Sequence, residues 1–154
     1  LENTFKKMGK IEFINITSTS NNRTCYINQA YLEKYKGIVN DRYYDCYKDK
    51  KEQVTLINLE EIDTFNKNIG KNVDYKDFRR NIILSRINLS KYINKKIIIQ
   101  NVVLKIHELC QPCNYLQKKL GIPNLVKMLV NKSGVRAEII SPGFISVGDK
   151  IKIY

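Results

Sequence analysis

The sequence predicts a mostly β fold with a few short helices, in a single domain. Three observations lead to this prediction. Short runs rich in β-branched residues recur along the chain, only one long stretch has the periodicity of an amphipathic helix, and no repeat or Pro/Ser-rich linker divides the sequence. Because strands do not alternate with long helices, we expect a β-barrel with helical insertions. A chain of 154 residues can bury a core without disulfides, so we expect one domain over residues 9–154, after an N-terminal extension at residues 1–8.

The first expected strand covers residues 9–17, where Ile11, Phe13 and Ile16 alternate with polar residues. Such alternation is typical of a strand with one buried face. Six further runs are rich in β-branched residues and are expected to form the other strands of the barrel: 53–57, 82–87, 95–100, 102–106, 135–140 and 149–154.

One amphipathic helix is expected over residues 58–70, with its apolar residues on a single stripe. Asn58 and Glu61 have the spacing of an N-cap residue and its partner at the third helical position. Gly70 is suited to the left-handed conformation that ends many helices. We expect this helix to serve packing rather than chemistry.

Two shorter helical patterns follow the last two cysteines. Pro112 suits the first position of a helix that ends at Gly121, and Pro123 suits the first position of a second helix that stops near Gly134.

The chain is strongly basic, with 27 Lys and Arg residues against 15 Asp and Glu and a net charge of +12. This excess favours an anionic partner, such as nucleic acid, an acidic membrane surface or a phosphorylated small molecule, or it solvates the surface without a specific partner. No segment approaches the roughly 20 apolar residues of a membrane span, which predicts a soluble protein. Four cysteines are too few for a secreted disulfide framework, so we expect reduced thiols and a cytoplasmic location.

Cys110 and Cys113 form a C-x-x-C pair close to His107, the only histidine. A zinc site needs four ligands, and Cys25 and Cys46 do not form a second pair in the sequence. A thioredoxin-like dithiol would need a βαβ unit, and a disulfide would be transient in a reducing compartment. A single working thiol and a small buried hydrophobe both remain open.

Read in order, five motifs resemble the MOSC domain, the module shared by molybdenum cofactor sulfurase C-termini, the mitochondrial amidoxime-reducing component and small stand-alone bacterial proteins. The resemblance covers roughly residues 9–154 and implies a MOSC-type β-barrel that binds the molybdenum cofactor, with a cysteine as metal ligand or sulfur carrier. The motifs are GIVNDRYY (37–44), QVTLINLEEI (53–62), DFRRNIIL (77–84), ELCQPCNYL (108–116) and SGVRAEIISPGFISVGDKI (133–151).

The resemblance implies that Cys113 is the metal ligand and catalytic thiol, and that Cys110 is an extra thiol. A thiolate is a fitting ligand for a soft metal, and the first turn of a helix stabilises a thiolate. We therefore expect Cys113 to be the thiol that faces the site, whereas Cys110 ends a strand and lacks the free N–H groups of the first helical turn. Arg79, Arg80 and Asn81 match the family's F-R-x-N segment, which implies contact with the cofactor.

Asp41 and Arg42 match the family's G-D-R-H element, although Asn40 replaces its glycine and Tyr43 its histidine. Arg136 matches a G-x-R-A strand and is implied to hold an anion or to brace the barrel. Guanidinium groups suit phosphate and oxo groups. We expect residues 37–44, residues 77–81 and Cys113 to converge on one concave site, with Cys25 and Cys46 neither paired nor bound to metal.

The leading hypothesis is a protein that binds the molybdenum cofactor. As an enzyme it would reduce N-hydroxylated small-molecule substrates with electrons from separate redox partner proteins; as a carrier it would hold cofactor or sulfur and meet cofactor-biosynthesis proteins. The alternative is a basic β-barrel that binds nucleic acid without metal. The tyrosines are scattered and form no stacking cluster, which disfavours nucleic acid as a partner.

Overall fold

The computed structural model describes residues 9–19, 22–46, 49–112 and 114–154. Within these residues, eleven strands form two sheets. The larger sheet has the strand order β11 (Ile151–Ile153), β7 (Lys96–Ile99), β8 (Val102–Leu109), β9 (Val135–Ser141), β5 (Val54–Asn58), β6 (Ile82–Ser85), β1 (Lys10–Thr17) and β2 (Thr24–Ile27). The smaller sheet has the order β10 (Gly143–Ser146), β3 (Gln29–Glu33) and β4 (Gly37–Ile38).

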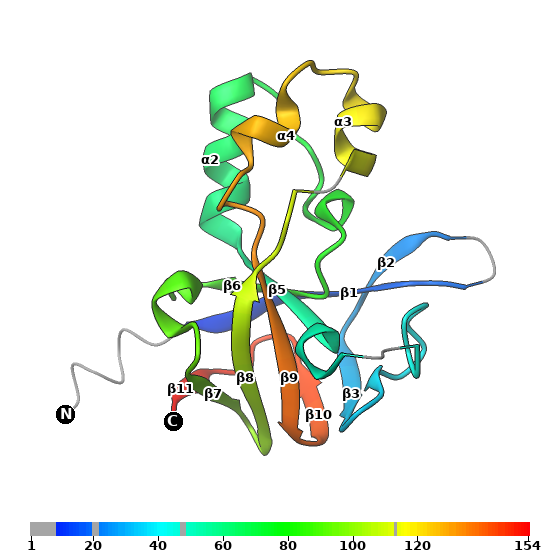
Figure 1. Ribbon diagram of the computed structural model, residues 1–154, viewed down its shortest axis with the longest axis vertical. Helices are drawn as coiled ribbons and strands as arrows, with labels where there is room; N and C mark the ends of the chain where they lie inside the picture. Colours follow the sequence, from blue (N-terminus) through cyan, green and yellow to red (C-terminus); the bar gives the residue numbers. More distant parts are fainter. Residues whose placement is uncertain (1–8, 20–21, 47–48, 113) are drawn as a thin grey trace.

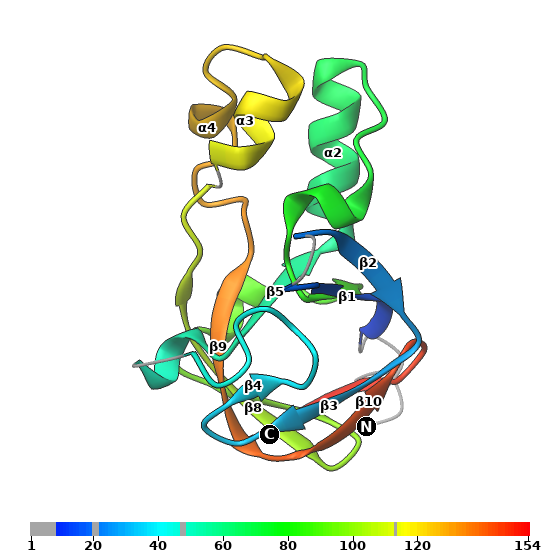
Figure 2. The ribbon, with the colours of Figure 1, turned by 90° about the vertical axis from the view of Figure 1, so that its right-hand side faces the viewer.

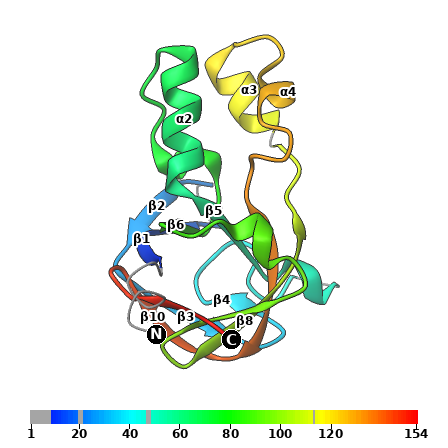
Figure 3. The same cartoon turned by 90° about the vertical axis from the view of Figure 1, so that its left-hand side faces the viewer.

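The sheets confirm the mostly β class, with a qualification about the barrel. All strand pairs are antiparallel except β5 with β6, and the strands curve around the lower half of the molecule (Figure 3). Among the described residues, hydrogen bonds do not close one continuous cylinder. The chain passes from the larger to the smaller sheet at Asn28, between β2 and β3, and a bridge joins Lys10 to Lys150.

Two hydrophobic cores lie on opposite faces of β5 and β6. Leu56 and Ile82 belong to the main core among the strands, whereas their neighbours Ile57 and Ile83 belong to a second core under the helices. Successive side chains of a strand point to opposite faces, so these two strands separate the cores. The helices accordingly gather at one end of the molecule and the sheets at the other (Figure 1).

Helix α2 (Leu59–Ile69) confirms the expected amphipathic helix, and Gly70 ends it in the left-handed conformation at φ 66°. The expected capping pair is wrong. The Asn58 side chain makes no cap hydrogen bond; its amide donates to the Ile87 carbonyl, and its oxygen accepts from the Leu89 N–H at 3.4 Å. The Asn58 side chain therefore bonds to the loop after β6 and does not cap the helix.

The two later helices are shorter than expected. Helix α3 (Asn114–Leu120) begins after Pro112, and helix α4 (Leu125–Met128) is a single turn that begins after Pro123. Asn124 and Asn131 adopt positive φ on either side of α4, which limits it to one turn. The remaining helical elements are the 3₁₀ turns η1 (Lys50–Glu52), η2 (Tyr75–Phe78) and η3 (Leu89–Tyr92). No helix in the described part of the chain is long and apolar enough to cross a membrane.

Candidate functional site

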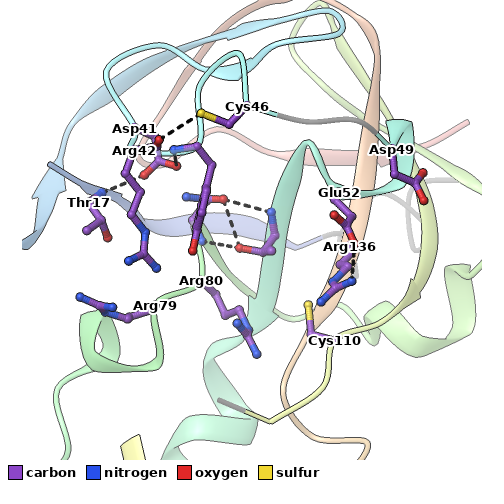
Figure 4. Close-up of a pocket in the computed structure, with 13 residues that line it drawn as sticks. Thr17, Asp41, Arg42, Cys46, Asp49, Glu52, Arg79, Arg80, Cys110 and Arg136 are labelled. Carbon is purple, nitrogen blue, oxygen red and sulfur yellow. Dashed lines mark hydrogen bonds and ion pairs between the residues drawn. The ribbon is translucent and has the colours of Figure 1, made fainter. Parts of the chain in front are cut away.

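A cavity of about 560 Å³ opens where several strand ends meet the loops beside them. Its wall includes Thr17 at the end of β1, Thr55 in β5 and Arg136 in β9, together with residues of the 41–52 segment and of the turn after η2. Figure 2 shows that β1, β5 and β9, which carry three of these residues, lie below the helices. We call this cavity the arginine cavity, because four arginines from three separate parts of the described chain line it: Arg42, the neighbours Arg79 and Arg80, and Arg136 (Figure 4).

The structure brings together six of the seven residues that the sequence nominated. Asp41, Asn81 and the four arginines all line the arginine cavity. The seventh, Cys113, lies outside the described residues. Sequence reasoning did not nominate Cys46, Glu52 or Cys110, although they also line the wall. Cys46 and Glu52 gave no distinguishing local signal, whereas Cys110 belongs to the C-x-x-C pair and to the motif at 108–116.

Arg79 combines backbone strain with an unmatched donor. It ends η2 in the left-handed conformation at φ 57°, which is uncommon for a residue other than glycine. Its Nη2 donates to the Asn22 carbonyl at 3.0 Å, and its guanidinium lies 4.0 Å from the ring centroid of Tyr115. Its Nε is buried and has no hydrogen-bond partner among the described residues. A buried donor in this state lacks an acceptor that a ligand could provide.

Arg80 ties two loops together. Its Nε donates to the Ser133 carbonyl at 2.7 Å, and its Nη2 donates to the Gln111 carbonyl at 2.9 Å. These bonds hold the segment that carries Cys110 against the turn before β9. Arg80 is therefore a structural residue that also brings positive charge to the cavity.

Asn81 joins neighbouring strands with its side chain. Its Oδ1 accepts from the Thr55 N–H and the Thr55 hydroxyl, both at 3.1 Å, and its Nδ2 donates to the Asn15 carbonyl at 3.3 Å. Both ends of the amide therefore bond to the protein itself. This bracing role differs from the ligand contact that the family resemblance implied.

Asp41 and Arg42 also have internal partners. Asp41 is buried and accepts from the Thr17 N–H at 2.8 Å and from the Tyr43 N–H at 3.4 Å, so it fixes the loop after β4. Arg42 donates from Nη1 to the Asn22 Oδ1 at 2.9 Å and lies 4.5 Å from the ring centroid of Tyr43. These two contacts orient the Arg42 side chain in the cavity wall.

Arg136 lies beside the buried thiol of Cys110. Its Nη1 pairs with Glu52 at 2.8 Å and approaches Glu108 at 3.8 Å. Cys110 is only 3% exposed, and burial raises the pKa of its thiol, against the opposing effects of the Arg80 and Arg136 charges. Cys110 directly follows the end of β8, as expected, and it lines the cavity wall.

The other candidate groups are distributed over the molecule. His107 lies in β8, and its Nε2 bonds to Glu138 at 2.9 Å. Cys25 and Cys46 are exposed free thiols. Within the described ranges, no group of three or more His, Cys, Asp or Glu residues could hold a metal ion.

Comparisons with known proteins give one family and several similar structures. The family model of the MOSC domain matches residues 44–152. The crystal structure of the YuaD protein from Bacillus subtilis is similar with a TM-score of 0.79 at 18% identity, and the match covers 94% of each chain. YiiM from Geobacillus stearothermophilus gives a TM-score of 0.75 at 16% identity, over 95% of this chain and 75% of that one. YiiM from Escherichia coli gives a TM-score of 0.73 at 12% identity, over 94% of this chain and 69% of that one. No curated protein sequence gives a significant match.

Proposed function

Because this chain belongs to the MOSC domain family, we propose that its arginine cavity binds the molybdenum cofactor. That family is associated with the cofactor, whose phosphate and oxo groups are anionic. Guanidinium groups bind such groups with paired N–H donors, and the cavity gathers four of them. The cavity volume of about 560 Å³ is in the ordinary range for a small-molecule site.

The unmatched Nε of Arg79 is the observation that carries this proposal. Buried donors nearly always have an acceptor, and this one, on an arginine of the cavity wall, has none among the residues that the structure describes. Other polar groups of the wall are already engaged: Asp41 bonds to backbone N–H groups, Glu52 pairs with Arg136, and Asp49 accepts from the Lys51 N–H. An anionic ligand would supply the acceptor that Arg79 lacks. The residues present therefore fit the cofactor.

A thiolate completes the ligand set that we propose. We assign this role to Cys113, on the family resemblance of its P-C context, with Cys110 as a second thiol in the wall. Bound there, the cofactor would supply a molybdenum centre able to exchange two electrons. Arg79 and Arg42 would hold its anionic groups, and Arg80 and Arg136 would keep positive charge beside the thiols.

Two forms of this function fit the same residues. As an enzyme, the protein would reduce N-hydroxylated substrates and receive electrons from separate redox partner proteins. As a carrier, it would hold sulfur on Cys113 as a persulfide and deliver it or the cofactor to cofactor-biosynthesis proteins. Both forms require a cofactor or sulfur species bound at the arginine cavity.

The test is the molybdenum and persulfide content of protein purified from a cofactor-producing host. We expect near-stoichiometric molybdenum or a persulfide in the wild type, loss in Cys113→Ser, and retention of most of it in Cys110→Ser and in the exposed control Cys25→Ser. A hydroxyl is close to a thiol in size but is a poor ligand for a soft metal. Greater loss in Cys110→Ser would transfer the ligand role to Cys110. Protein without molybdenum or persulfide in all variants would refute the proposal.

A further inference from the structure

Asn22 contacts two arginines that are far apart in the sequence. Its side-chain Oδ1 accepts from Arg42 Nη1 at 2.9 Å, and its backbone carbonyl accepts from Arg79 Nη2 at 3.0 Å. Asn22 lies between β1 and β2 and adopts φ 54°, a left-handed conformation that asparagine tolerates better than most residues. One residue therefore connects the loop after β4 with the turn after η2. Figure 4 shows the two arginine side chains on the same side of the cavity.

These two arginines have uncharged partners among the described residues. Neither Arg42 nor Arg79 forms an ion pair within the described ranges, whereas Arg136 pairs with Glu52. Each guanidinium also lies over a tyrosine ring, Tyr43 for Arg42 and Tyr115 for Arg79. A neutral amide and the two rings therefore orient both arginines without neutralising them. Two oriented guanidiniums without a carboxylate partner suit a dianionic phosphate group.

We propose that Asn22 is a positioning residue that holds Arg42 and Arg79 ready for the phosphate group of a ligand. This inference rests on the proposed function and adds to it a phosphate subsite at the mouth of the cavity. The essential property of Asn22 is that it accepts hydrogen bonds while carrying no charge. A carboxylate at the same place would keep both arginines oriented but would compete with the phosphate for them.

The test compares substitutions of Asn22 by titration calorimetry with inorganic phosphate. Asn22→Asp is expected to weaken phosphate binding about tenfold, because the added carboxylate lies beside both guanidiniums. Asn22→Gly accepts the same positive φ and keeps the backbone carbonyl for Arg79, but it releases Arg42, so a weakening of about threefold is expected. The matched control is Asn124→Asp, which adds the same charge at an exposed residue with φ 63° outside the cavity wall. It should bind phosphate within about twofold of the wild type.

The thermal unfolding temperature of the phosphate-free variants separates positioning from a structural role. A merely structural Asn22 would lose stability and affinity together. We expect Asn22→Asp to lose affinity while its unfolding temperature stays equal to or above that of the wild type, because the carboxylate relieves repulsion between the arginines. Wild-type affinity in Asn22→Asp, or a wild type that binds no phosphate, would overturn this inference. Neither result would decide the proposed function, which depends on molybdenum and persulfide content.

Discussion

At the scale of single residues, the cavity wall separates into side chains whose polar groups bond to the protein and side chains that keep a donor without a partner among the described residues. Asn81 belongs to the first kind, because its amide joins Thr55 of β5 to Asn15 of β1. Arg79 belongs to the second, because its Nε is buried without a partner among the described residues. Both lie in the same sequence motif, so their neighbouring positions give no indication of this difference. The hydrogen bonds of the folded chain distinguish them.

Asn81→Ala is expected to lower the free energy of unfolding by about 2–3 kcal/mol, because it removes three side-chain hydrogen bonds and leaves partly buried partners unsatisfied. Arg79→Lys keeps the charge and the backbone conformation, so we expect a change below about 1 kcal/mol. Urea denaturation followed by circular dichroism measures both values. Equal losses in the two variants would show that the wall does not divide in this way.

At the scale of elements, hydrophobic periodicity predicts the strands and helices whose formation depends on their own local sequence. It identifies β1 and α2, and Gly70 ends α2 as expected, because alternation and a terminal glycine act within the element itself. The helix ends that depend on tertiary contacts could not be predicted from the sequence. Asn58 precedes α2 with the spacing of a cap, but the loop that follows β6 uses its side chain. The left-handed residues that shorten α4 are asparagines, which only favour that conformation and do not require it.

Asn58→Ser separates the two possible roles of this side chain. Serine is as good an N-cap as asparagine, so a capping role would leave stability unchanged. The serine hydroxyl is too short to replace both hydrogen bonds of the amide to Ile87 and Leu89. We therefore expect the free energy of unfolding to fall by about 1–2 kcal/mol, measured by urea denaturation. A variant as stable as the wild type would favour the capping role instead.

At the scale of the whole molecule, the arginine cavity is a product of contacts between distant segments. The family motifs nominated six of its residues, because motifs preserve residues that act together even when they are far apart in the chain. Glu52 and Asn22 lie outside these motifs, and Cys110 lies in one of them but was expected only as an extra thiol. Their roles depend on β8 reaching the wall, on η1 approaching β9, and on the β1–β2 connection reaching both arginines. These are long-range arrangements that local spacing cannot express.

Arg80 joins its own turn after η2 to the segment at Gln111 and to the turn at Ser133, so it should control access to Cys110. Its guanidinium bonds the carbonyls of Gln111 and Ser133 at once, which a lysine ammonium cannot reproduce with the same planar geometry. Arg80→Lys keeps the positive charge, so the electrostatic effect on the pKa of the Cys110 thiol is largely retained. The segment around Cys110 should then open more often, by about tenfold for a loss of roughly 1.4 kcal/mol in local stability.

Thiol labelling with N-ethylmaleimide, mapped residue by residue by mass spectrometry, measures this opening. We expect Cys110 to react about tenfold faster in Arg80→Lys than in the wild type, since its side chain is only 3% exposed in the folded protein. The exposed Cys25, which lies in β2 and not in the cavity wall, is the internal control and should react at the same rate in both proteins. If Cys110 reacts at the wild-type rate in Arg80→Lys, then the backbone bond from Cys110 to Gly134 and the surrounding packing hold the segment without Arg80.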